Sequence, residues 1–228
     1  MPSRMIVFDM DGVLVDVSES YRETIVQTVR HFTGETIARP LIQEYKNQGG
    51  WNNDWDLSQK ICADLGTPVD YQVIVGQFNL LFLGTGAAPG LIERERWIAR
   101  PGVLERLNSL YEFGIFTGRL RHEADITLKR FATGLRFDAM VCADGLTHQK
   151  PHPEGLHKIA ALDQQRPLIY VGDTVDDARS ARAAGVPFAG VAAATHGHRA
   201  ELLRLFAAEK AHIVIDNINE LEQALEKS

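Results

Sequence analysis

The sequence has few cysteines, and this excludes a fold held together by disulfide bonds. Cys62 and Cys142 are the only two among 228 residues, whereas disulfide-rich scaffolds carry four or more. Cys142 ends an apolar run, so we expect a packed thiol there rather than a nucleophile. The first apolar run, 5–8, is too short for a signal peptide and stops at Asp9. We therefore expect a reducing compartment, most simply the cytoplasm.

Long apolar runs and an excess of positive charge are also missing. No apolar stretch approaches the roughly 20 residues that a membrane-spanning helix needs. The formal net charge is -6, and nucleic acids and anionic membranes attract basic surfaces. We therefore expect neither of these partners. Phosphate substrates remain compatible with this charge, because a metal ion and a few well-placed cations can dominate locally. The pattern says nothing about oligomeric state.

Short apolar runs recur along the chain, and each is bounded by polar residues, glycine or proline. They span 5–8, 115–116, 139–142, 168–171, 188–191 and 213–215. Short continuous runs are typical of strands buried on both faces of a parallel sheet. Helical patterns separate the later runs, over 102–113 and 176–184, with Gly114 and Gly185 just past their ends. The alternation predicts an α/β fold, a Rossmann-like, doubly wound parallel sheet.

The segment 17–100 has no convincing strand pattern and is too long for an ordinary connection. We predict that it is an inserted helical cap domain, and that 1–16 and 101–228 form the core. Its first helix has Tyr21 and Ile25 on one face, with Ser20 and Glu23 as a capping box. Further helices are expected at about 39–47, 55–65 and 69–83, and the glycine-rich segment 84–90 is interpreted as a linker. We expect this insertion above the carboxyl ends of the strands, where an open α/β sheet binds its ligand.

Polar residues follow the apolar runs where strands are predicted to end. Asp9-Met10-Asp11-Gly12 follows the first run, Thr117-Gly118-Arg119 the second, and Gly172-Asp173 the fourth; Lys150 precedes a predicted helix. Parallel strands end at one edge, so these groups are expected to meet. Several carboxylates in one crevice repel each other, and oxygen ligands without a His/Cys set suit a hard cation such as Mg²⁺.

This set of groups also fits covalent phosphoryl transfer. A carboxylate such as Asp9 is a competent nucleophile, and Asp11 is near enough to protonate a leaving alkoxide. Lys150 and the Thr117 hydroxyl would hold the phosphoryl oxygens. Gly12 and Gly118 would let the backbone approach a phosphate.

The four motifs DMDGVLVD, TGR, KPHP and GDTVDD, in this order, resemble the haloacid dehalogenase superfamily, in the branch with a helical cap after the first motif. The resemblance implies that Asp9 is the nucleophile and Asp11 the general acid/base, and that Thr117 and Lys150 hold the phosphoryl group. It implies Mg²⁺ ligation by Asp9, the Asp11 carbonyl and Asp173, with Asp177 in support. Asp11 favours phosphoryl transfer over dehalogenation.

Three assignments stay open at this point. Arg119 could reach a second anionic group of the substrate, or pair with an acid of the core. Asp176 lies beside Asp177, although spacing favours Asp177 as the residue that supports the metal. In the insertion, the polar segment 47–55 holds Asn52 and Asn53, which could contact a polar substrate or belong to a helix-to-helix turn in which a residue such as Asn53 caps the next helix.

The sequence therefore predicts a Mg²⁺-dependent phosphatase that hydrolyses a small phosphorylated metabolite through an aspartyl-phosphate. A phosphomutase and a non-catalytic regulatory protein that keeps the fold are the alternatives. The sequence does not name the substrate.

Overall fold

The computed structural model describes residues 4–164, 166–194 and 197–227, which form two compact units. The first comprises residues up to Val15 and from Trp97 onward, and the second comprises Asp16–Arg96. The strands β2 (Val15–Asp16) and β5 (Arg96–Trp97) pair where the chain passes from one unit to the other. Within the described residues, no helix has both the length and the apolar character needed to cross a membrane.

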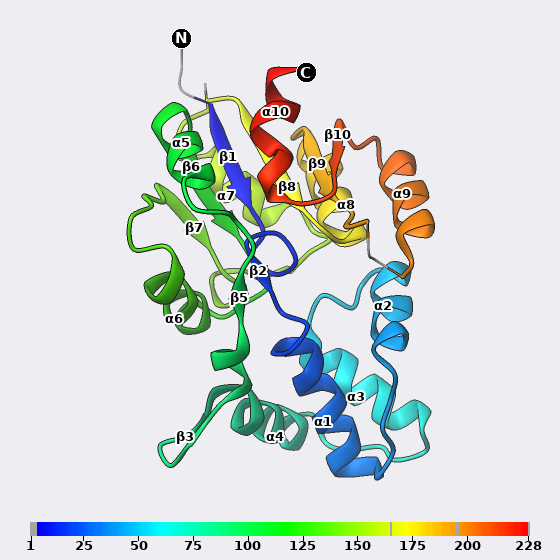
Figure 1. Ribbon diagram of the computed structural model, residues 1–228. Coiled ribbons are helices and arrows are strands. Elements are labelled where there is room, and N and C mark those ends of the chain that lie inside the picture. Colours follow the sequence, from blue (N-terminus) through cyan, green and yellow to red (C-terminus); the bar gives the residue numbers. More distant parts are fainter. Residues whose placement is uncertain (1–3, 165, 195–196, 228) are drawn as a thin grey trace. The chain divides into compact units, whose positions relative to one another are not determined.

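The first unit is built on a parallel sheet (Figure 1). In the part of the chain that the structure describes, six strands pair in the order β10-β9-β8-β1-β6-β7. They are β1 (Met5–Phe8), β6 (Glu112–Phe116), β7 (Ala139–Val141), β8 (Leu168–Gly172), β9 (Phe188–Val191) and β10 (Ile213–Ile215). Each pair is parallel. The six predicted strands and the α/β fold class are thus confirmed.

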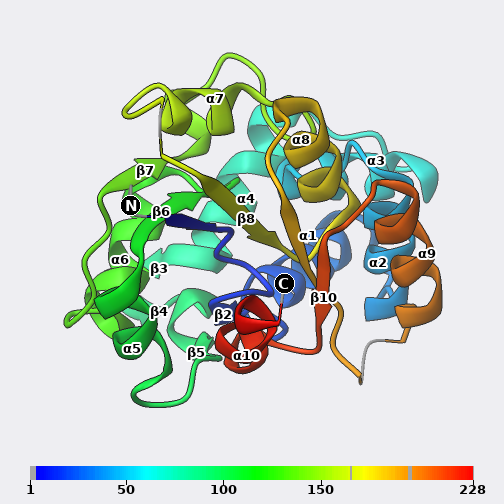
Figure 2. The same ribbon diagram turned by 90° about the horizontal axis from the view of Figure 1, so that it is seen from above.

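Helices cover both faces of this sheet. Figure 2 shows α7 and α8 on one face and α5 and α10 on the other. The helices of this unit are α5 (Val103–Leu110), α6 (Arg121–Phe131), α7 (Glu154–Ala160), α8 (Val175–Ala184), α9 (Arg199–Ala208) and α10 (Leu221–Glu226), with the short 3-10 helices η2 (Ala143–Gly145) and η3 (Ile218–Glu220). A sheet covered on both sides has no solvent face, which explains why its strands are continuous apolar runs.

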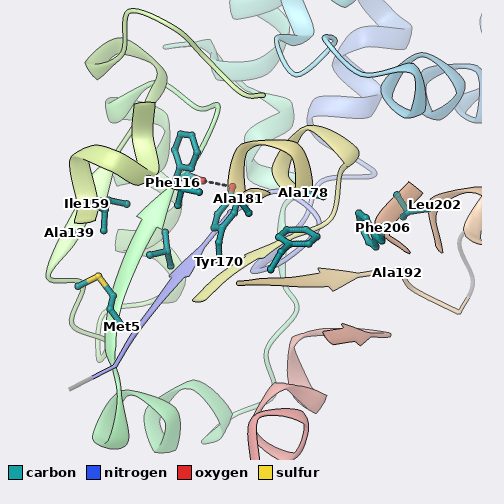
Figure 3. Packing of buried hydrophobic residues seen from close by; sticks show 13 residues of the cluster. Met5, Phe116, Ala139, Ile159, Tyr170, Ala178, Ala181, Ala192, Leu202 and Phe206 are labelled. Carbon is teal, nitrogen blue, oxygen red and sulfur yellow. Dashed lines mark hydrogen bonds between the residues drawn. The ribbon is translucent and has the colours of Figure 1, made fainter. Parts of the chain in front are cut away.

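The core between the sheet and helices α7 and α8 is apolar and rich in aromatic residues (Figure 3). Met5 of β1, Phe116 of β6 and Tyr170 of β8 lie in one buried cluster with Ala178 and Ala181 of α8. The Tyr170 hydroxyl donates to the Phe116 carbonyl at 3.2 Å. Burial of such side chains contributes about 1.5–3 kcal/mol each, so this core fixes the strands whose ends carry the candidate site.

The predicted helix over 102–113 extends three residues beyond the C-terminal end of the observed helix. α5 ends at Leu110, and β6 begins at Glu112, which pairs with Met5. Leu110 repeats the helical spacing, but its side chain is 65% exposed, so it does not hold the helix against the sheet. Residues 112 and 113 therefore pair with β1 as part of a parallel strand instead of continuing the helix.

The second unit is mainly helical. Its helices are α1 (Tyr21–Thr33), α2 (Arg39–Gln48), α3 (Asp54–Asp64) and α4 (Tyr71–Leu83), followed by η1 (Leu91–Arg94). Tyr21 of α1 packs on Phe82 of α4 with ring centroids 4.0 Å apart. The apolar stripe predicted for α1 is thus the face that packs within this unit.

Two local predictions in this unit are wrong. The capping box at Ser20 does not form, because the Ser20 side chain makes no capping hydrogen bond and Glu23 instead pairs with Arg39 at 2.9 Å. The segment 84–90 is not a plain linker, because β3 (Gly84–Thr85) and β4 (Ala88–Pro89) pair as a short antiparallel hairpin. Gly84 adopts φ +79° there, a conformation that favours glycine.

Candidate active site

The candidate site lies where two neighbouring strands end. β1 and β8 are paired, with Phe8 opposite Val171, so Asp9 and Asp173 follow at the same edge. Within the sheet, the strand that follows β1 in sequence is β6, which lies on one side of the β1–β8 pair. The strand that follows β8 is β9, which lies on the opposite side. This is the topological switch point, at which open α/β sheets bind their ligands.

Three carboxylates meet at this edge. Asp9, Asp173 and Asp177 each offer an oxygen within 4.8 Å of the others. Gly12 makes room for this approach, because a Cβ built on it would lie 1.9 Å from Asp173 Oδ2. Gly12 also adopts φ +72°, so both its backbone and its neighbour require glycine. Such an all-oxygen donor set is suited to a hard divalent cation.

Lys150 is the buried cation between two of these acids. Its Nζ lies 3.0 Å from Asp9 Oδ1 and 2.8 Å from Asp177 Oδ1. The ammonium also lies 4.9 Å from the centroid of the Phe116 ring, a cation–π distance. One ammonium thus offsets part of the charge of the three carboxylates.

Asp177 supports this arrangement rather than presenting a free carboxylate. Its Oδ1 accepts from Tyr170 Oη at 2.7 Å, and its Oδ2 accepts from the amide and the hydroxyl of Thr174 at 3.0 and 2.6 Å. With Lys150 also on Oδ1, its oxygens are well occupied, and Asp177 is suited to holding Lys150. Asp9 and Asp173 are therefore the better direct ligands for a cation.

The contacts around α8 distinguish Asp176 from Asp177. Asp176 belongs to a different ion pair, with Arg179 Nη1 3.6 Å from its Oδ1, so Asp177 is the acid that joins the cluster. The helix is capped by Thr174, whose hydroxyl accepts from the Asp177 amide. Asp173 is therefore not occupied as the helix cap.

The electrostatics of the cluster follow from burial and proximity. Burial raises the pKa of Asp9 to about 7, and Asp177 and Asp11 add to the rise while Lys150 opposes it. Burial alone would also raise the pKa of Asp177, but Lys150 and the hydrogen bonds from Thr174 and Tyr170 lower it overall. The pKa of Lys150 is raised by Asp177 and Asp9 despite its burial. Asp9 is thus the acid whose charge is incompletely balanced, and a further cation would complete the balance.

The second predicted motif follows β6. Thr117 is buried, and its hydroxyl accepts from the amide of Arg119 at 3.2 Å, while Gly118 between them is exposed. Arg119 Nε and Nη2 donate to Asp11 Oδ1 at 2.7 and 2.5 Å. Of the two alternatives for Arg119, the pair with an acid of the core is the one observed. A direct contact between Arg119 and a substrate stays a prediction.

Residues 4–185 match the family of haloacid dehalogenase-like hydrolases. The chain belongs to this family. The site described above holds the four motifs that carry the resemblance, so the family assignment and the geometry concern the same residues.

Named relatives of this haloacid dehalogenase-like chain include phosphatases. It is 26% identical over 196 residues to "Pyrophosphatase PpaX" of Anoxybacillus flavithermus, which covers 82% of each chain. It is 32% identical over 198 residues to "Imidazoleglycerol-phosphate dehydratase" of Phytophthora nicotianae, which covers 83% of this chain but 43% of that relative. The chain thus spans less than half the length of the second relative.

A solved structure extends the likeness to the whole fold. "Phosphatase Tt82 from Thermococcus thioreducens" is 26% identical, with a TM-score of 0.67, and the match covers 98% of this chain and 100% of that one. The Rossmann-like fold of haloacid dehalogenase-like hydrolases is therefore shared over nearly the full sequence.

Asn52 and Asn53, the two asparagines predicted as possible substrate contacts in the insertion, have different environments. Asn53 is the N-cap of α3, where its Oδ1 accepts from the amides of Trp55 and Asp56 at 2.9 and 3.3 Å. Asn52 Nδ2 and Trp55 Nε1 are buried and have no hydrogen-bond partner among the described residues. The alternative use of Asn53 as a helix cap is thus observed, whereas Asn52 keeps an unused donor.

Sequence reasoning missed two residues of the site. Tyr170, which donates to Asp177, lies inside an apolar strand and reads as core. Thr127 lies in α6 and accepts from Arg119 Nη1 at 2.7 Å, and no motif marks it. A buried tyrosine hydroxyl needs a partner, so Tyr170 is the one that sequence could have signalled.

A second group of potential metal ligands, His148, His152 and Glu154, lies on the surface. The Glu154 carboxylate already accepts from the amides of Thr147 and His148 and pairs with Lys158 at 2.8 Å. In the cluster at the ends of β1 and β8, Asp9 and Asp177 are buried and Asp173 is half-buried, so this cluster is central to the sheet and better suited to chemistry.

The raised pKa of Asp9 predicts a pH-dependent stability. With a folded-state pKa near 7 and an ordinary unfolded value of 3.8, folding disfavours ionised Asp9. The contribution of protonated Asp9 to the free energy of unfolding is therefore fully present below about pH 4 and is lost as the pH rises through 7. In EDTA, the free energy of unfolding of Asp9→Asn minus that of the wild type should be larger at pH 8 than at pH 4 by about 1–4 kcal/mol. Urea unfolding measures it, and a difference that does not change with pH would show that Asp9 is ionised throughout.

Proposed function

We propose that this chain is a Mg²⁺-dependent phosphatase that hydrolyses a small phosphate ester through a phosphorylated Asp9. The observation that carries the proposal is the meeting of Asp9 and Asp173 at one sheet edge, with Lys150 3.0 Å from Asp9 Oδ1. The family is one of hydrolases, and two relatives are named as phosphatases. The negative net charge of the chain gives no reason to expect a nucleic-acid or membrane partner.

The first step would transfer the phosphoryl group to the enzyme. An ionised Asp9 oxygen attacks phosphorus in line, the bond to the ester oxygen breaks, and Asp11 gives its proton to the departing alkoxide. Lys150 contacts Asp9, which helps to keep the nucleophile ionised despite its burial. The products of this step are a free alcohol and an acyl phosphate at Asp9.

The second step would restore the enzyme. Asp11, now a carboxylate, takes a proton from water, whose oxygen attacks the same phosphorus. The bond between phosphorus and Asp9 breaks, inorganic phosphate leaves, and Asp9 is again a carboxylate. Asp11 thus acts as the general acid in the first step and as the general base in the second, so its protonation state is restored at the end of the cycle.

Four groups would hold the transferring phosphoryl group. Lys150 and the Thr117 hydroxyl would stabilise its oxygens, and the exposed Gly118 would let the backbone approach them. Mg²⁺ would be held by Asp9, Asp173 and the Asp11 carbonyl, with Asp177 acting through Lys150, and it would supply positive charge where phosphoryl charge develops. The second unit would act as a cap that selects the substrate, in a cytoplasmic enzyme.

Phosphate release from a panel of esters tests this function. The panel contains sugar phosphates, phosphoglycolate, nucleotides and p-nitrophenyl phosphate, each with Mg²⁺ and with EDTA. We expect Mg²⁺-dependent release that Asp9→Asn lowers to below a tenth of the wild-type rate, because losing the nucleophile costs several kcal/mol at about 1.36 kcal/mol per decade. Asp176→Asn removes a neighbouring buried acid outside the site and should keep activity within about threefold.

Other outcomes of this panel identify the alternatives. Movement of label within one sugar phosphate, without free phosphate, would indicate a phosphomutase. No release from any ester would favour a non-catalytic protein, and full activity in Asp9→Asn would remove Asp9 as the nucleophile.

In the same proposal, Asn52 contacts the substrate through its unused Nδ2 donor. For the best ester of the panel, Asn52→Ala should raise KM about 2- to 12-fold with little change in kcat, because a lost hydrogen bond costs about 0.5–1.5 kcal/mol. Asn53→Ala is the matched control: it should lower the free energy of unfolding by about 1 kcal/mol through the lost cap. An unchanged KM in Asn52→Ala would exclude the contact.

A further inference from the structure

Arg119 is a buried cation that the proposed reaction does not use. The residue is 2% exposed, whereas the Asp11 side chain that it contacts is 31% exposed. A guanidinium of this burial is costly unless its donors are paired. Its position between α6 and the first motif therefore needs a reason.

Both hydrogen bonds from the Arg119 guanidinium to Asp11 fall on the same oxygen. Arg119 Nε and Nη2 donate to Oδ1, and no residue in the described part of the chain donates to Oδ2. An oxygen that receives two N–H donors has no room for a proton of its own. When Asp11 is protonated, the proton therefore resides on Oδ2, the oxygen that Arg119 leaves open.

Arg119 is itself held at several points. Nη1 donates to the Thr127 hydroxyl at 2.7 Å, the amide donates to Thr117 Oγ1, and the carbonyl accepts from the Ala143 amide at 2.9 Å. The planar guanidinium thus connects α6 with Asp11, while the Arg119 backbone is fixed next to the end of β6. With so little exposure, it is placed to orient Asp11 rather than to meet a substrate.

We propose that Arg119 is a positioning residue that fixes the Asp11 carboxyl group so that Oδ2 alone exchanges the catalytic proton. The inference rests on the function proposed above. In the first step, the proton on Oδ2 moves to the ester oxygen as the bond from that oxygen to phosphorus breaks and the Asp9–phosphorus bond forms. Arg119 exchanges no proton, and it stays on Oδ1 while Asp11 becomes a carboxylate.

This role predicts a dependence on the leaving group. Phenoxide, whose conjugate acid titrates near 10, needs a proton to leave, whereas p-nitrophenoxide spreads its charge into the nitro group and leaves without one. The quantity to compare is kcat/KM, which covers the steps up to formation of phosphorylated Asp9 and excludes its hydrolysis.

The test uses phenyl phosphate and p-nitrophenyl phosphate, two esters of similar size. With Arg119→Met, kcat/KM should fall about 10- to 100-fold for phenyl phosphate, a substantial part of what a general acid contributes. For p-nitrophenyl phosphate, the fall should stay under about threefold. Equal losses on both esters would overturn the proposal, because a substrate contact or a damaged fold acts on both alike.

A double-mutant cycle asks whether Arg119 acts through Asp11. In an Asp11→Asn background, Arg119→Met should cause no further loss on phenyl phosphate. Losses that multiply would contradict the proposal. Arg119→Lys keeps the charge but has one nitrogen, so it should recover only part of the rate; full recovery would show that charge suffices and orientation does not matter.

If Arg119→Met does not fold, Thr127→Val provides the same test. It removes the acceptor of Nη1 and keeps both the volume and the Arg119 charge, so we expect the same leaving-group selectivity at smaller amplitude. Wild-type protein that hydrolyses neither ester would count against the proposed function, whereas active wild type with unselective variants would count against Arg119 alone.

Discussion

The structure depends on bringing three carboxylates together, two of them buried, without letting their mutual repulsion destabilise the fold. Asp9, Asp173 and Asp177 have oxygens within 4.8 Å of one another, and Lys150 lies between Asp9 and Asp177. Removing one partner of a buried ion pair typically costs about 3–5 kcal/mol. A site of this kind persists only where the surrounding sheet fixes every group. The charge of Asp9 remains incompletely balanced in it, so a further cation would stabilise the ionised form.

The sheet supplies that fixation through its topology. Because β1 lies between β6 and β8, the residues after these three strands converge on one edge, although Asp9 is more than a hundred positions away in sequence from both Thr117 and Asp173. Tyr170 links the layers, since its ring packs in the apolar core while its hydroxyl contacts both the Phe116 carbonyl and Asp177. Core packing and site electrostatics therefore meet in the same side chain.

Much of this was predictable from the sequence, and the remainder had physical reasons to escape it. Strands buried on both faces leave a strong apolar signal, and residues at strand ends are bound to meet, so Asp9 and Asp173 could be placed together. The end of α5 could not be predicted, because the helical spacing continues through Leu110, whereas the pairing of Glu112 with β1 is a long-range contact. The Arg119–Asp11–Thr127 contacts depend on the placement of α6, which no local pattern encodes.

The central claim is that Asp9 carries the phosphoryl group covalently. The direct measurement is to quench the enzyme during turnover of p-nitrophenyl phosphate with Mg²⁺, reduce it with borohydride, and sequence its peptides by mass spectrometry. An acyl phosphate at Asp9 is reduced to homoserine, so homoserine should appear at position 9 in turning-over enzyme and be absent without substrate. Unmodified Asp9 throughout, or homoserine at another acidic residue such as Asp173, would contradict the account.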